Sequence, residues 1–78
     1  MDLAADLEKE TKKWVKKLEK ELPNVKITGE NASFITNINA YVKDSKHFAE
    51  KGDLIRSFEA IIWAWAWLEI LKELEMIK

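Results

Sequence analysis

The sequence has no cysteine, one proline, two glycines and one histidine among its 78 residues. Without cysteine the chain can form no disulfide, no thiolate zinc site and no cysteine nucleophile. A single histidine also leaves few metal ligands, because a zinc site needs three or four that converge. We therefore expect no metal site, no cofactor and no enzymatic activity.

The sequence also lacks a long apolar run and an excess of charge of either sign. Its longest uninterrupted apolar run, Ala60 to Leu68, is nine residues, well short of the ~20 that cross a bilayer. Lys and Arg number 13 against 14 Asp and Glu, so no global field favours nucleic acid or an anionic membrane. Charged sequence follows Met1 without a signal-peptide pattern. We expect a soluble, cytoplasmic protein without a membrane partner.

The chain length predicts a single domain over residues 1–78. A domain of this size buries only about 60% of the surface that its unfolded chain exposes, so oligomerisation is a plausible source of further stability. Abundant Lys and Glu, with no Gln, form a bias typical of thermophile proteins.

Apolar residues recur at steps of three, four and seven in three segments, which predicts helices over about 2–22, 31–51 and 53–75. Short connections then give an all-α, three-helix, up-down-up antiparallel bundle. The stripes predict that the following residues are buried together: Leu7, Trp14, Leu18, Phe34, Ile38, Tyr41, Phe48, Phe58, Ile61, Trp65 and Leu68.

The connections carry their own signals. Pro23 is expected to force Leu22 out of the helical region and end the first helix, and Val25 and Ile27 are expected to plug that end of the bundle. Thr28 or Asn31 is a candidate N-cap of the second helix. Gly52 is expected to close that helix with a positive φ, and Asp53 to cap the third.

Several of these residues also carry a family resemblance: Tyr41, Asp44, Ser45, Phe48, Lys51, Gly52, Asp53, Arg56, Phe58, Glu59, Ala60, Trp67 and Leu68. In these residues and in its alternating Trp-Ala pattern the chain resembles the archaeal domain of unknown function 357. The resemblance extends over most of the chain and is strongest from Tyr41 to Leu68. It implies a three-helix bundle and no established activity.

From Ala60 to Leu68 the third segment is apolar nearly all round, which a helix in a three-helix bundle does not need. Besides the core stripe it carries a second stripe of Trp63, Trp67, Ile70 and Leu74. We interpret this stripe as an interaction surface for a second copy of the chain, as a homodimer, or for an unidentified protein partner. Cover by the first helix or by residues 25–27 within one chain is the competing interpretation.

The alternative is nucleic-acid binding by a basic patch on the first helix, consisting of Lys9, Lys12, Lys13, Lys16, Lys17 and Lys20. Six acidic residues balance these lysines between residues 1 and 22, and no aromatic residue interleaves them on the exposed side. We therefore expect a solvated, salt-bridged face, with nucleic acid an unlikely partner. Asp44, His47 and Glu50 could share a strip of the second helix, but such a triplet is more often a solvated face than a metal site.

Overall fold

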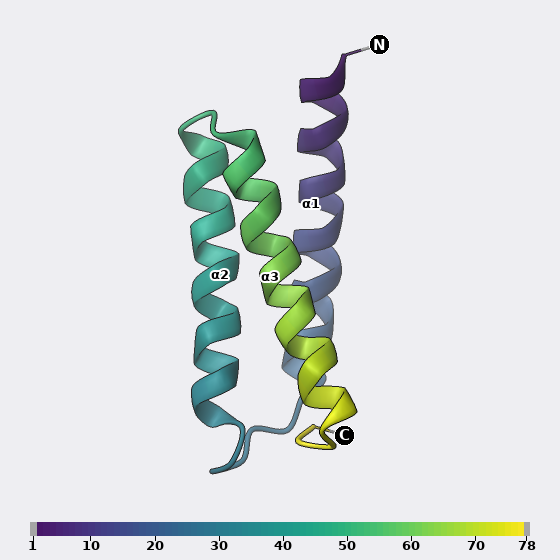
Figure 1. The fold of residues 1–78 in the computed structure, drawn as a ribbon, viewed down its shortest axis with the longest axis vertical. Coiled ribbons are helices and arrows are strands. Elements are labelled where there is room, and N and C mark those ends of the chain that lie inside the picture. The colour runs from purple at the N-terminus through teal and green to yellow at the C-terminus, as the bar shows by residue number, and fades with distance from the viewer. Residues whose placement is uncertain (1, 78) are drawn as a thin grey trace.

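A computed structural model describes residues 2–77, and within that range three α-helices run up, down and up (Figure 1). They are α1 (Leu3–Glu21), α2 (Ala32–Glu50) and α3 (Leu54–Glu73), with a short 3-10 helix, η1 (Leu22–Asn24), after α1. The predicted all-α antiparallel bundle is confirmed, and each helix ends within two residues of its predicted bounds. The molecule measures 43 × 20 × 17 Å.

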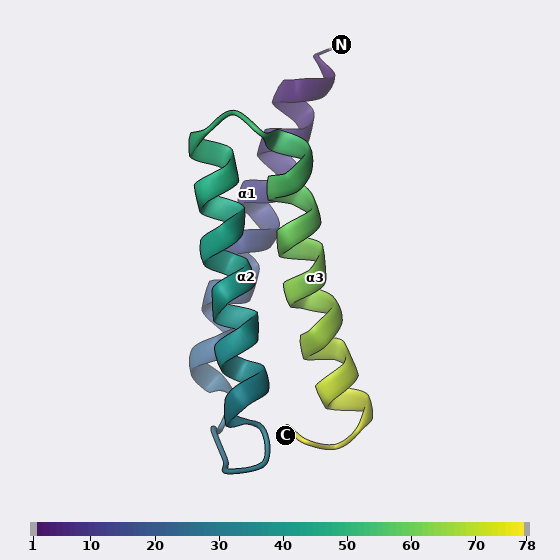
Figure 2. The ribbon, with the colours of Figure 1, turned by 60° about the vertical axis from the view of Figure 1, so that its left-hand side comes forward.

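Helix α3 packs against both other helices and is the central element of the bundle. Figure 2 shows α1 behind the hairpin of α2 and α3, with its first turn projecting beyond the hairpin turn. Leu3 on that first turn is 76% exposed, although it precedes the expected core residue Leu7 by four positions on the same helix. The α2–α3 hairpin ends before the first turn of α1, so no helix covers Leu3.

The fully buried core is more aliphatic than the sequence predicted. Of the eleven residues expected there, only Leu18, Ile38, Ile61 and Leu68 are buried, and the others, including Phe58 and Trp65, are half-buried. The prediction of an aromatic core was therefore wrong in its helical phase. On α3 the buried face consists of Ser57, Ala60, Ile61, Ala64, Leu68 and Leu71.

Small side chains explain why this side of α3 faces the core. Ser45 of α2 and Ser57 of α3 are both completely buried, and each hydroxyl reaches the backbone carbonyl of the other residue, at 2.8 Å and 2.7 Å. Such reciprocal bonds need close helix backbones, and Ala60 and Ala64 continue the same small surface along α3. Large aromatic rings do not fit between helices this close, so they lie beside the contact.

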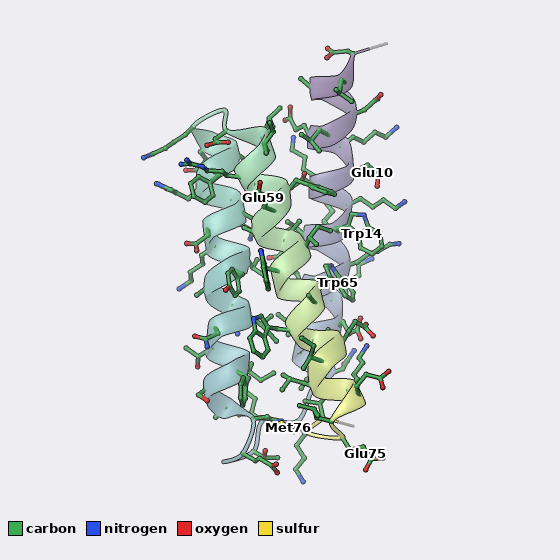
Figure 3. The ribbon with its side chains drawn as sticks, in the orientation of Figure 1. Glu10, Trp14, Glu59, Trp65, Glu75 and Met76 are labelled. Atoms are coloured by element: carbon green, nitrogen blue, oxygen red, sulfur yellow. The ribbon has the colours of Figure 1, made fainter. Side chains whose placement is uncertain are left out.

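The tryptophans fill the seams between helices. Trp65 meets Trp14 of α1 edge to face, with ring centroids 5.7 Å apart, and its indole N–H donates to the Trp14 carbonyl at 3.1 Å; Figure 3 shows the two side by side. Trp67 lies on the other side, 5.7 Å from the Phe34 ring of α2. Each ring therefore covers an edge of the aliphatic core.

Pro23 ends α1 in a different way from the one expected. Leu22 keeps right-handed helical angles (φ −55°, ψ −42°), and its N–H still donates to the Leu18 carbonyl. Because proline has no N–H, the α-helical ladder stops there, and a tighter turn follows in which the Val25 N–H donates to the Leu22 carbonyl at 3.0 Å. A residue before proline usually prefers extended backbone, but Leu22 stays helical here because one more helical turn follows it.

The hairpin joint between α2 and α3 is confirmed. Gly52 has φ +78°, its N–H donates to Ala49, and the Asp53 N–H donates to Phe48, which is the glycine-dependent Schellman ending. The Asp53 carboxylate accepts the Arg56 N–H at 3.1 Å and caps α3. The turn is therefore fixed by local hydrogen bonds alone.

Replacing Gly52 by valine is expected to lower the free energy of unfolding by more than ~1 kcal/mol, because a β-branched residue is strained at positive φ. Gly29 is the matched control, since it has no positive φ and a Cβ there meets no atom within 4 Å. Urea unfolding followed by circular dichroism measures both variants. Equal effects of Gly52→Val and Gly29→Val would contradict the proposed strain.

The far end of the bundle is closed by residues that the sequence did not predict. Ile27 is 64% exposed, so the expected plug consists of Val25 without Ile27. Ile77 is buried there instead, and Met76 packs against the core. Figure 3 shows Met76 beside the loop that precedes α2. Glu75 turns the chain back with φ 57°, a left-handed conformation unusual for a residue with a side chain.

Asn31 holds this closure together. Its side chain is fully buried, accepts the Thr28 N–H at 2.8 Å, and donates to the carbonyls of Lys26 at 3.1 Å and Met76 at 2.9 Å. It occupies the N-cap position of α2, but its side chain does not cap that helix. The amide instead links the loop to the end of α3.

Candidate functional site

The most exposed apolar surface of the bundle lies on the side of α3 that faces away from the core. We call it the outer strip and define it by Ile55, Ile62, Trp63, Ile70 and Leu74. These side chains are between 42% and 66% exposed. Isolated exposed apolar residues are normal on a protein surface, but several on one face of one helix need an explanation, although exposed Glu59 and Glu73 lie on the same face and divide the strip.

The structure places three of the four residues of the predicted interaction surface, namely Trp63, Ile70 and Leu74, in this strip. Trp67 is half-buried against Phe34 instead, because it lies on the flank of α3 that faces α2. Sequence reasoning missed Ile55 and Ile62. Their signal was present, since they fall on the same side of a helical wheel as Ile70.

No other part of the described chain covers the outer strip. Helix α1 packs on the opposite flank of α3, where Trp14 meets Trp65. The loop residue Ile27 is itself exposed. Exposure of the strip therefore argues against the competing interpretation of cover within one chain.

The lysines of α1 form a second surface, which we call the lysine face: Lys9, Lys12, Lys13, Lys16, Lys17 and Lys20. At 3.6 residues per turn they fall within a sector of about 140°, opposite the buried Leu18. All six are exposed. Lys17 lies over the Trp14 ring, 4.6 Å from its centroid.

The glutamates of α1 are segregated from this face. On the helical wheel they lie on its two borders, next to the neighbouring helices. Glu19 pairs with Lys46 of α2 at 2.8 Å, and Glu21 pairs with Lys72 of α3. The hydrogen bond from Lys72 to Glu21 raises the pKa of this ammonium group above its ordinary value. Two of the five acidic residues of α1, Glu19 and Glu21, thus pair with neighbouring helices, whereas Glu8 pairs with Lys12 within α1.

The weaker candidates do not form a site. Asp44, His47 and Glu50 are all exposed on α2, and among residues 2–77 no three acidic or histidine side chains are placed to hold a metal ion. Arg56 pairs with Asp53 at 3.6 Å. Within the described range, no helix combines the length and apolarity needed to span a membrane.

Comparison with known proteins adds a family and a solved relative. A sequence model of DUF357, described as a protein of unknown function, matches residues 12–77. The crystal structure of protein AF1782 from Archaeoglobus fulgidus, of the same family, is similar with a TM-score of 0.89 and 42% sequence identity. The match covers 99% of this chain and 97% of that chain. No curated protein matches the sequence.

Proposed function

Because the chain belongs to the DUF357 family of proteins of unknown function, we propose from its own surface that it is a non-catalytic interaction module. Its partner is a second copy of the chain, held through the outer strip of α3. The observation that carries the proposal is the exposure of Ile55, Trp63 and Leu74, each more than half exposed on one helix.

The size of the strip supports a second copy as the partner. One tryptophan and four aliphatic side chains at these exposures present on the order of 400–500 Å² of apolar surface, at the upper end for a soluble monomer. Two copies facing each other bury about twice that area. The total approaches the ~1,000 Å² that a specific interface requires, before rim contacts are added.

The arrangement along α3 also suits a two-fold pairing. Half-buried Ala66 lies between Ile62 and Ile70, one turn from each. A small side chain at the centre of a helix face lets a second helix approach closely. In a two-fold dimer the same strip of both copies forms the interface, and each contact occurs twice. Trp63 of each copy then packs beside Ala66 of the other.

Analytical ultracentrifugation over micromolar concentrations tests the dimer. The wild type is expected to sediment as a dimer. Combining Trp63→Glu with Leu74→Glu is expected to give a folded monomer, because four carboxylates would enter the interface without partners. The matched control is Ala40→Glu with Ile27→Glu, since both residues are exposed apolar residues outside the strip. It is expected to remain dimeric.

Three results would contradict the proposal. These are a wild-type monomer at high micromolar concentration, a wild-type dimer that survives the Trp63→Glu, Leu74→Glu pair, and a control pair that dissociates equally well. The first would point to a different protein as the occupant of the strip. Circular dichroism of each variant verifies that the helices are retained.

A further inference from the structure

We propose that the lysine face of α1 binds the phosphate backbone of double-stranded DNA without reading its sequence. This surface is separate from the outer strip of α3, so the inference does not depend on the dimer. The sequence argued against such binding because residues 1–22 carry equal numbers of lysines and acidic residues. The structure places the four glutamates of α1 on the borders of the lysine face, although exposed Asp6 lies within its sector.

This placement leaves the lysine face positive, with only Asp6 within its sector, although residues 1–22 as a whole are neutral. Glu19 and Glu21 are held by Lys46 and Lys72 of the neighbouring helices, so they do not neutralise the face. Lys12 pairs with Glu8 at 3.0 Å. Within residues 2–77, no carboxylate lies within salt-bridge distance of five members of the face: Lys9, Lys13, Lys16, Lys17 and Lys20.

The dimensions of the face match a DNA duplex. From Lys9 to Lys20 the helix rises ~17 Å, at about 1.5 Å per residue. A duplex of that length carries about ten phosphates, at one charge per ~1.7 Å. A helix with side chains is about 10–12 Å across, which fits a major groove ~12 Å wide. The lysines spread to both sides of α1, so they can reach both phosphate backbones that border the groove.

The composition of the face selects among polyanions. It carries no Arg, Asn or Gln to read base edges, and lysine can donate there only to guanine, so most of its contacts would be to phosphates and its sequence selectivity would be weak. It offers no free aromatic ring on which single-stranded bases could stack, because Trp14 packs on Trp65 and lies beneath Lys17. The major groove of duplex RNA is too narrow for a helix. A membrane-surface helix would need an apolar face free to enter the lipid, whereas the apolar side of α1 is buried on α3.

Fluorescence anisotropy with a labelled duplex of about 20 base pairs and mixed sequence tests this assignment. The wild type is expected to bind at low salt. Its affinity should fall about 10³-fold between about 50 and 200 mM NaCl if all six lysines contact phosphates. The triple variant Lys13→Gln, Lys16→Gln, Lys20→Gln should bind more weakly and lose only about 40-fold over the same range, as three contacts predict.

The matched control is the triple variant Lys26→Gln, Lys43→Gln, Lys51→Gln. These lysines are exposed elsewhere, and the control has the same net charge as the face variant. It is expected to keep the wild-type salt dependence. No wild-type binding at low salt, or an equal loss in both variants, would overturn the proposal. Equally tight binding to single-stranded DNA, duplex RNA or phosphatidylserine vesicles would overturn it as well. The face would then bind polyanions in general and would not prefer duplex DNA.

Discussion

Leu68→Ala is expected to lower the free energy of unfolding by about 3–5 kcal/mol. Leu68 is completely buried on α3, and removing its side chain leaves a cavity in the core. The expected decrease is a large share of the 5–15 kcal/mol that stabilises a typical domain. At about 4–8 °C per kcal/mol, the melting temperature should fall by at least ~12 °C. Urea unfolding and thermal melts by circular dichroism measure both quantities.

Phe58→Ala is the informative comparison. The sequence pattern predicted that Phe58 lies in the core, where this change would cost ~3–5 kcal/mol. The structure leaves Phe58 half-buried on the flank of α3, so the larger side chain is expected to give the smaller effect. If Phe58→Ala destabilises the protein as much as Leu68→Ala does, the helical phase described for α3 is wrong.

Asn31→Ala is expected to cost about 3 kcal/mol, although it removes no apolar side chain. The amide makes three hydrogen bonds, one of them to Met76 in the C-terminal turn. Each net bond contributes about 0.5–1.5 kcal/mol, and a buried carbonyl left without a donor costs about 1–3 kcal/mol. The loss should also release the C-terminal turn, which amide hydrogen exchange would detect as faster exchange at Met76 and Ile77.

Asn39→Ala is the control for this effect. Asn39 is exposed on the same helix, and its amide donates only to the Ile35 carbonyl one turn earlier. Its replacement should change stability by less than ~0.5 kcal/mol, as is usual for surface positions. A cost at Asn31 no greater than that at Asn39 would show that the buried amide does not hold the loop to α3.

The three helices and the hairpin joint were predictable from the sequence because their signals act over a few residues. The left-handed Gly52 and the capping Asp53 complete their hydrogen bonds within five positions along the chain. Apolar spacing likewise located each helix to within two residues. The exception is Pro23, because Leu22 was predicted to leave the helical region and instead keeps helical angles.

The rotation of α3 was decided only by the tertiary structure. A helix that is apolar nearly all round has several phases that bury similar area, so the hydrophobic pattern could not choose among them. The choice depends on close packing of Ser57, Ala60 and Ala64 against α2, which moves the tryptophans to the seams and exposes the outer strip.

The positive charge of the lysine face and the role of Asn31 were also decided by the tertiary structure. The sequence identified the lysines, but the zero net charge of residues 1–22 did not indicate that Glu19 and Glu21 face other helices. Their placement leaves one side of α1 positive. Asn31 read as a helix cap, because its partner Met76 is 45 residues away. Local hydrogen bonds and spacing therefore determined the elements of this protein. Contacts between residues distant in the chain determined which faces are buried and which remain free to bind.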